Sequence, residues 1–410
     1  MVKEQKKSDI LIIGGGVAGL TLAKLLGDQG MNVHLVEPRP PAPFKDTSAS
    51  SRTVALMQSS LRILGAAGFD DFCREYGTPL NIMRIYDDST PNKKPIISSF
   101  DSFEIGMDGF GLNIPNSLLR AHLYEAVQQN KNITIHETSL KDYSVEGNAH
   151  VIAILENDMT IKSPLIIGAD GRESTVRNIA GIAAHKKQYD QSALTFIVNH
   201  SRAHEFTSTE FHRAGGPFAL VPMKGNQCSV VWVDKTENVE KLIKLPKEAF
   251  ETAVQNATND VLGGITLETN PQSWPLCAIQ AKSLTAPRTA LIAEAAHVMS
   301  PITAQGLNLS LRDVASLAEV IMDAIRIGSD YGTSVTLRKY ERRRSIDIKT
   351  RFTGVNGMNQ IVSNDLLPIK DLRRAGLKIM DKLSPLKMTA MHIGLAPNLD
   401  EGRLMKGEAL

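Results

Sequence analysis

The 410-residue sequence has few cysteines and almost no net charge. Its three cysteines, Cys73, Cys228 and Cys277, lie far apart and have no CxxC spacing, which indicates reduced thiols in a cytoplasmic compartment. Lysine and arginine total 46 against 44 aspartates and glutamates, so the net charge of +2 gives no overall field that would attract nucleic acid. We therefore expect a cytoplasmic protein without a nucleic-acid partner.

Long hydrophobic runs are absent as well. No stretch reaches the roughly 18 uninterrupted apolar residues that a membrane-spanning helix needs. Lysines at positions 3, 6 and 7 followed by an apolar run from Ile10 resemble a signal peptide, but the consecutive glycines Gly14 to Gly16 would break its helix. We expect a protein that does not cross a membrane, although it can bind peripherally at the inner face of the cytoplasmic membrane.

The first forty residues have the pattern of a βαβ unit. An apolar strand at 9–13 leads into glycines at 14–19, a helical segment and a second strand at 32–37. Two later apolar runs, 165–171 and 290–294, also end in turns. Because ligands of open α/β sheets bind beyond the carboxyl ends of strands, we expect these three strand ends to be neighbours.

The rest of the chain has a different texture. Residues 183–277 include β-branched and aromatic runs at 193–199 and 228–234, which predict an inserted sheet. From Thr336 onward the pattern is helical and charged, and we expect the run Arg338–Arg344 to be a solvated helix face. The fold class is therefore α/β.

Gly14, Gly16 and Gly19 have the G-x-G-x-x-G spacing of a dinucleotide-binding turn. The glycines allow a tight turn, close approach of the backbone to a pyrophosphate, and packing of the following helix on the strand. That helix begins near Val17 and directs its N-terminal amides at the phosphates. Glu37 lies 23 residues after Gly14, where a carboxylate can bind a ribose hydroxyl. The turn predicts a bound dinucleotide, either FAD or NAD.

Two further segments distinguish FAD from NAD. Gly-Ala-Asp-Gly-Arg-Glu-Ser at 168–174 and the string from Glu294 to Asp313 resemble the second and third FAD motifs of the flavoprotein aromatic hydroxylases. They are similar in particular to the ubiquinone-biosynthesis hydroxylases of the UbiH/UbiF/COQ6 family. Matching pieces at 52–56, 216–222 and 274–276 extend the resemblance over nearly the whole chain.

The resemblance implies a noncovalently bound FAD and gives roles to particular residues. Glu37 would bind the adenosine ribose, while Arg52 and Arg120 would lie near the flavin and the pyrophosphate. Asp170 would order the turn beside the cofactor, and Glu294 would contact its ribityl and phosphate region. The implied cofactor-binding residues are Gly14, Gly16, Val17, Ala18, Gly19, Glu37, Arg52, Arg120, Asp170, Glu294, Ala304, Gln305, Gly306, Leu307 and Asn308. The residues that would line the flavin are Pro301, Gln305, Gly306 and Asn308.

Three positions depart from the family pattern. The usual Gly-Asp of the third motif is Ala293 and Glu294, the usual His is Ser300, and the usual Gly before Gln-Gly is Ala304. Glutamate keeps the carboxylate on a side chain that is one methylene longer, so we expect cofactor binding to survive. Ser300 and Ala304 bear on the geometry of the active site.

The implied activity is FAD-dependent hydroxylation of the aromatic ring of a polyprenylphenol intermediate in ubiquinone biosynthesis. NAD(P)H and O2 would be consumed through a flavin hydroperoxide, and no side chain would act as nucleophile or acid–base catalyst. Because one glycine fingerprint is present, NAD(P)H is expected to bind transiently. Two alternatives stay open: a related flavin hydroxylase or dehydrogenase acting on another phenolic substrate, and a flavin-bearing assembly subunit without turnover.

The predicted domains are discontinuous. The Rossmann-like FAD-binding domain would comprise 1–78, 104–182 and 278–360. The inserted, mainly β substrate domain would comprise 79–103 and 183–277. The C-terminal helical segment would comprise 361–410.

Other features are weaker. His200 and His204 lie four residues apart without an obvious third ligand, so no metal is expected. His297 has no catalytic role in our interpretation. The segment from Leu366 to Met391 has six basic residues against two aspartates and predicts a basic amphipathic helix that docks on a membrane surface or a quinone-biosynthesis complex.

Overall fold

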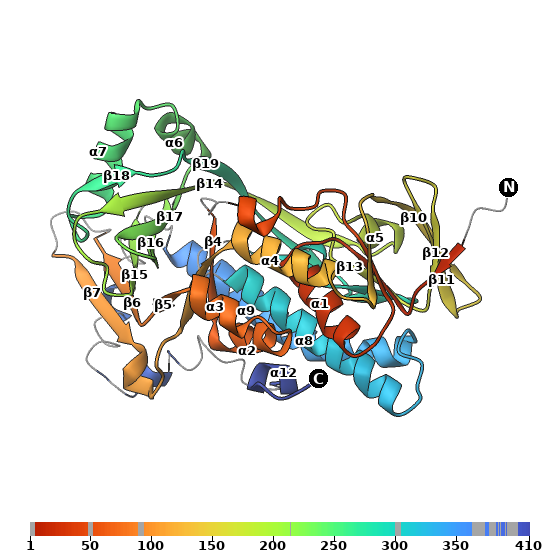
Figure 1. Ribbon diagram of the computed structural model, residues 1–410. Coiled ribbons are helices and arrows are strands. Elements are labelled where there is room, and N and C mark those ends of the chain that lie inside the picture. Colours follow the sequence, from red (N-terminus) through yellow and green to blue (C-terminus); the bar gives the residue numbers. More distant parts are fainter. Residues whose placement is uncertain are drawn as a thin grey trace.

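The computed structural model describes residues 5–47, 52–88, 94–213, 215–299, 305–362, 374–376, 383, 385, 387–389, 391 and 401–410. Two parts lie side by side, and the long strands β14 and β19 run from one to the other (Figure 1). One part contains a parallel sheet with helices, and the other contains a large, mostly antiparallel sheet.

The first part is built on a six-stranded sheet with the order β20-β21-β13-β2-β3-β9. These strands are β2 (Ile10–Ile13), β3 (Val33–Val36), β9 (Ile133–His136), β13 (Ile166–Gly168), β20 (Thr285–Ala286) and β21 (Thr289–Leu291). All neighbours are parallel except β20 and β21. Gly168 aligns with Ile13 on one side and Leu291 on the other. The prediction that the three strand ends are neighbours is thereby confirmed.

Helices and two small sheets complete this part. The helices are α1 (Val17–Asp28), η1 (Phe44–Asp46), α2 (Gln58–Ala66), α3 (Asp70–Tyr76), α4 (Asn116–Gln128), α5 (Thr175–Ile179), η3 (Ala293–Ala295), α8 (Gln305–Arg326) and α9 (Ser334–Val362). One small sheet has the order β1 (Gln5–Lys7), β12 (Thr160–Ser163), β11 (His150–Leu155), β10 (Leu140–Glu146). The other has the order β4 (Thr53–Met57), β8 (Gly111–Pro115), β5 (Thr78–Leu80). Strands β2, β3, β13 and β21 are buried at every position, as expected for parallel strands covered on both faces.

The second part is a nine-stranded sheet. Its order is β22 (His297–Val298), β19 (Gln272–Ala281), β14 (Ala184–His200), β17 (Gln227–Asp234), β16 (Gly216–Met223), β15 (Thr207–Arg213), β6 (Ile82–Asp87), β7 (Ile96–Asp101), with β18 (Ile265–Leu267) on β14. Helices α6 (Thr236–Leu242) and α7 (Lys247–Ala257) lie at its far end in Figure 1, and η2 (Ser102–Ile105) follows β7. The strands predicted at 193–199 and 228–234 are confirmed as parts of β14 and β17.

The nine-stranded sheet has a core of its own. Leu194, Phe196, Phe211 and Phe218 are buried there together with Phe250 of α7. Val239 of α6 and Val254 of α7 belong to the same buried cluster, so one face of the sheet packs against these helices. Strands β6 and β7 belong to this sheet although they precede most of it by about a hundred residues.

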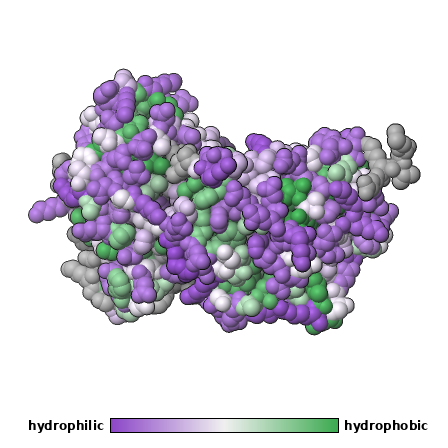
Figure 2. All heavy atoms as spheres, in the orientation of Figure 1, coloured by the Kyte–Doolittle hydropathy of each residue, from purple (hydrophilic) through white to green (hydrophobic). Residues whose placement is uncertain are grey.

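Among the described residues, no helix is long and apolar enough to cross a membrane. Hydrophilic residues cover most of the face shown in Figure 2, with hydrophobic residues in separate patches.

One sequence-based expectation changes at the C-terminal side, and another is left untested. Arg344 is buried, so the expectation of a fully solvated Arg338–Arg344 face is wrong at that position. Its side chain pairs with a buried aspartate across the helix interface. Most of the predicted basic segment, Leu366 to Met391, lies outside the described residues. Of its cations, Arg374 is buried and donates to the carbonyls of Asp87 and Lys94, and Lys387 pairs with Glu104.

The helix α12 (Arg403–Lys406) packs on α2 and α8. Leu404 and Met405 are buried in the same core as the six-stranded sheet. The Leu404 amide donates to Glu319 Oε1 at 2.9 Å, and Arg62 donates to the Met405 carbonyl at 3.2 Å. These contacts show that residues 401–410 help to hold the first part together.

Candidate functional site

The glycine turn between β2 and α1 has two glycines that the protein itself requires. A Cβ atom on Gly14, whose φ is +112°, would lie 2.3 Å from the Ala169 carbonyl oxygen. A Cβ on Gly19 would lie 2.0 Å from the Gly14 carbonyl oxygen. At Gly16, the residue before α1, a Cβ would meet no atom within 4 Å. Packing therefore explains Gly14 and Gly19, whereas Gly16 borders open space, as expected where a ligand approaches the backbone.

Glu37 and Arg120 meet at this turn. The Glu37 carboxylate accepts hydrogen bonds from the amides of Gly15 at 2.7 Å and Arg39 at 2.8 Å. Arg120 on α4 donates to the Gly15 carbonyl at 2.9 Å and the Arg39 carbonyl at 2.7 Å, and it lies 3.5 Å from Glu37. The Gly15 and Arg39 amides and Arg120, which lies 83 positions after Glu37 in sequence, thus hold the Glu37 carboxylate beside the glycine turn.

Asp170 follows β13 and shapes the second turn. Its carboxylate accepts from Ser174 Oγ at 2.5 Å and from the Val176 amide at 3.1 Å, while Ser174 caps α5 by accepting from the Arg177 amide. Burial raises the pKa of Asp170, and the hydrogen bonds from Ser174 and Val176 oppose that rise. Gly171 beside it has a φ of +84°, which glycine adopts without strain.

The third turn follows β21 and carries Glu294. Its carboxylate pairs with Arg172 at 3.2 Å, and both side chains are about half exposed. Ala293 has a φ of +56°, a conformation that glycine adopts without strain. This explains why the family pattern has glycine at this position. Arg177 is buried and donates to the carbonyls of Ala295 and Arg172. The second and third turns are therefore tied together by arginines that sequence reasoning did not single out.

Arg52 lies on the same side of the molecule. Its guanidinium carbon is 4.8 Å from the centre of the Trp274 ring, within range of a cation–π interaction. Burial lowers the pKa of Arg52. The charge of Glu294 raises this pKa and the charge of Arg172 lowers it, so the Arg52 guanidinium interacts electrostatically with both residues. Arg52, which directly precedes β4, thus lies near the Arg172–Glu294 pair and contacts Trp274 of β19.

The first turn of α8 begins with Gln305, whose Oε1 accepts from Arg351 at 2.8 Å. Gly306 is exposed and Leu307 partly buried, while Asn308 is fully buried. The Asn308 amide donates to the Ala55 carbonyl at 2.8 Å and accepts from the Met57 amide at 2.9 Å and Ser60 Oγ at 2.7 Å. The observed role of its side chain is to hold β4 and α2 to α8, and its contact with the flavin stays a prediction.

Three predicted positions cannot be placed. Ser300, Pro301 and Ala304 lie outside the described residues, so the two departures at 300 and 304 stay as expectations about geometry.

His297, to which the sequence interpretation gave no catalytic role, forms a buried pair with Asp313 that was not predicted. His297 Nε2 lies 2.6 Å from Asp313 Oδ2, and the same carboxylate accepts from the Ala293 amide at 2.9 Å. Arg344 donates to Asp313 Oδ1 at 2.7 Å. Burial opposes the charge of Asp313, but His297 and Arg344 hold its pKa below the usual range. Asp313 was visible in the third motif, whereas nothing local identified Arg344 as its partner.

His200 and His204 are used within the protein. His204 Nε2 lies 2.9 Å from the Met223 carbonyl oxygen, and His200 Nε2 lies 3.4 Å from Cys228 Sγ. Within the described ranges, no group of three His, Cys, Asp or Glu side chains is placed to hold a metal ion.

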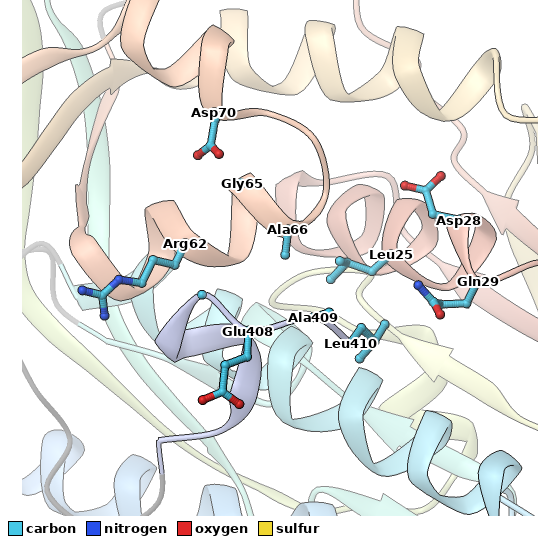
Figure 3. A pocket seen from close by; sticks show the side chains of 11 residues that line it. Leu25, Asp28, Gln29, Arg62, Gly65, Ala66, Asp70, Glu408, Ala409 and Leu410 are labelled. Atoms are coloured by element: carbon cyan, nitrogen blue, oxygen red, sulfur yellow. The ribbon is translucent and has the colours of Figure 1, made fainter.

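A pocket of about 420 Å³ lies between α1, α2 and the C-terminal residues (Figure 3). Leu25 and Asp28 line it from the last turn of α1, Gln29 lines it from the residue after that helix, and Arg62 and Leu410 face it from the other elements. The glycine turn is at the opposite end of α1, so this pocket is separate from the dinucleotide site.

Comparison with known proteins decides which dinucleotide the site takes. The family described as FAD binding domain matches residues 7–348. The chain belongs to this FAD-binding family. FAD is therefore its cofactor, and the open space at Gly16, the Glu37 carboxylate and the free start of α1 fit the pyrophosphate and ribose of that group.

Related sequences align with nearly the whole length of this chain. A ubiquinone hydroxylase, UbiL, of Rhodospirillum rubrum is 31% identical over 99% of this chain and 94% of its own. The 3-demethoxyubiquinol 3-hydroxylase of Escherichia coli is 27% identical over 95% of this chain and 98% of its own. Together with the family match, these relatives show that this protein is an FAD-dependent aromatic monooxygenase.

Solved structures share the fold. The p-nitrophenol 4-monooxygenase of Pseudomonas putida superposes with a TM-score of 0.79 at 16% identity, covering 97% of this chain and 100% of its own. A Klebsiella pneumoniae HpxO variant complexed with FAD superposes with a TM-score of 0.73 at 14% identity, covering 95% and 98%. At such low identity, these structures establish only the fold of this protein.

Proposed function

We propose that this enzyme hydroxylates the aromatic ring of a polyprenylphenol intermediate in ubiquinone biosynthesis, with NAD(P)H and O2 as co-substrates. The observation that carries the proposal is the meeting of three cofactor turns at one sheet edge, on a chain aligned almost end to end with ubiquinone hydroxylases. A bound FAD would supply the redox chemistry, which is the uptake of electrons from NAD(P)H and the activation of O2 for transfer to an electron-rich ring.

The protein's own groups bind and orient. The first turn of α1 presents backbone N–H groups and the positive end of its dipole to a pyrophosphate. Glu37 offers carboxylate oxygens to ribose hydroxyls, and the Gly15 and Arg39 amides fix its direction. The first turn of α8 directs a second helix N-terminus at the flavin side of the site, where it stabilises negative charge.

We further propose that 79–103 and 183–277, which supply most of the nine-stranded sheet, form the substrate domain, while the end of β19 and β22 fall within the proposed FAD-binding domain. Its strand β19 carries Trp274 to Arg52, and its strand β22 follows the third turn directly. In this proposal the sheet covers the flavin side of the site, where it can exclude water from the reacting ring.

Product analysis tests the proposed reaction. Holoenzyme is supplied with NADH or NADPH, ¹⁸O₂ and either a short-tailed polyprenylphenol or a soluble phenol. We expect one ¹⁸O in the ring of the prenylated substrate for each NAD(P)H consumed. Hydroxylation of the soluble phenol alone would identify a related hydroxylase, NAD(P)H oxidation with other acceptors a dehydrogenase, and no turnover an assembly subunit.

Membrane docking by the segment from Leu366 to Met391 remains part of the proposal, because a polyprenyl tail is poorly delivered through water. Truncation after Ser363 would also remove Leu404 and Met405 from the core. A cleaner test reverses the charges of Lys378 and Lys382 and measures cosedimentation with anionic liposomes. Weaker binding at unchanged FAD content supports docking, and unchanged binding contradicts it.

A further inference from the structure

A chain of charged side chains links the third turn to the first residue of α8. At one end, the Asp313 carboxylate accepts from the Ala293 amide at 2.9 Å and from Arg344 at 2.7 Å. Arg344 also donates to Asp347 Oδ2 at 2.7 Å. Asp347 Oδ1 accepts from Arg351 Nε at 2.8 Å. The contacts thus pass from α8 to α9 and along α9.

The other end of the chain reaches the first residue of α8. Arg351 Nη1 donates to Gln305 Oε1 at 2.8 Å. The links are well sheltered, since the Asp347 and Arg351 side chains are each 12% exposed and Arg344 is buried. Arg312 lies 3.5 Å from Asp347 as well. Three arginines thus face two aspartates, and the cluster carries net positive charge behind the start of α8.

The contact with Arg351 fixes how the Gln305 amide points. A guanidinium only donates hydrogen bonds, so the amide oxygen must face Arg351. The amide NH2 group then faces the other way and can only donate. A glutamine without such a partner could turn either its oxygen or its nitrogen toward a ligand. Arg351 therefore turns Gln305 into a donor.

We propose that Arg351 is a positioning residue that orients Gln305 to donate a hydrogen bond to the flavin and so favours its reduction. The inference rests on the proposed placement of Gln305 beside the flavin. Reduction adds negative charge to the flavin, which a donor amide and the nearby positive cluster stabilise. Asp347 acts behind Arg351 by fixing the direction of its guanidinium.

The test is the midpoint potential of FAD in the full-length holoenzyme, measured by anaerobic reductive titration, with FAD affinity and melting temperature followed in parallel. Arg351→Met should lower the equilibrium constant for flavin reduction about tenfold, or about 30 mV for a two-electron couple. Arg351→Lys keeps a charged donor and should restore most of the wild-type potential. Arg338→Met removes the same charge from an exposed position of α9 and should leave the potential unchanged.

Three outcomes decide the matter. The inference is overturned if the Arg351→Met holoenzyme binds FAD fully and keeps the wild-type potential, provided that Gln305→Leu does shift the potential. If Gln305→Leu changes neither the potential nor FAD affinity, the placement of Gln305 beside the flavin is wrong. Should Arg351→Met not fold, Arg351→Gln provides an uncharged amide whose direction is not fixed, and a wild-type potential in that variant overturns the inference.

Discussion

Gly16 is the position at which the cofactor, rather than the protein, should forbid a side chain. Its φ of −76° is open to any residue, and a Cβ there meets nothing within 4 Å. Replacing it with alanine should change the free energy of unfolding of the apoprotein by about 1 kcal/mol or less, the scale of such changes at a helix start. Gly16→Val should behave similarly in the apoprotein.

FAD binding should respond differently. A side chain at Gly16 occupies the space where the pyrophosphate approaches the backbone, so at least one charge-assisted hydrogen bond is lost, worth about 1.5–3 kcal/mol. That loss corresponds to a Kd raised about 10- to 150-fold, and more for valine than for alanine. The matched control is Gly19→Ala, whose Cβ would lie 2.0 Å from the Gly14 carbonyl oxygen and should cost about 1–3 kcal/mol of apoprotein stability.

Urea unfolding of the apoproteins and titration with FAD, followed by quenching of flavin fluorescence, measure the two effects separately. The reasoning fails if Gly16→Val stays folded and binds FAD with wild-type affinity. It also fails if Gly16→Val destabilises the apoprotein as much as Gly19→Ala, because the space outside Gly16 would then not be open.

Three further predictions concern single residues. Ala293→Gly should raise the free energy of unfolding by about 1 kcal/mol or less, since it relieves a φ of +56°, and a destabilised variant in urea unfolding would contradict this. Glu294→Gln should weaken FAD binding by about 1.5–3 kcal/mol and Glu294→Asp by less, so equal affinities in apoprotein titrations would show that the third turn does not hold the cofactor. Burial, His34 and Lys6 lower the pKa of His136 to about 4. The folded pKa is below the unfolded value of 6.5, so the stabilisation is present above pH 6.5 and is lost as pH falls toward 4, and a His136→Gln variant with a parallel stability curve between pH 6.5 and 5 would refute this.

The cofactor turns could be predicted because their signals are local. The spacing of Gly14, Gly16 and Gly19 follows directly from how a chain leaves a strand and enters a helix, and an apolar run that ends in Asp170 or Glu294 marks the carboxyl end of a buried strand. Parallel strands of one open sheet share an edge for their ligand, so the adjacency of the three turns followed from the strand pattern. The strands at 193–199 and 228–234 were likewise visible from their composition.

The partners of individual side chains were decided only by the tertiary structure. Arg344 reads as one of several charges on an exposed helix, yet it lies 31 residues from Asp313 in sequence and is buried against it. Asn308 lies in a flavin motif, yet its side-chain amide donates a hydrogen bond to the carbonyl of Ala55, which is 253 residues away in sequence. Helical periodicity says which residues share a face but not which other element covers that face. A buried charge needs a counterpart, and Arg344 obtains the buried Asp313 only because of how α8 packs against α9.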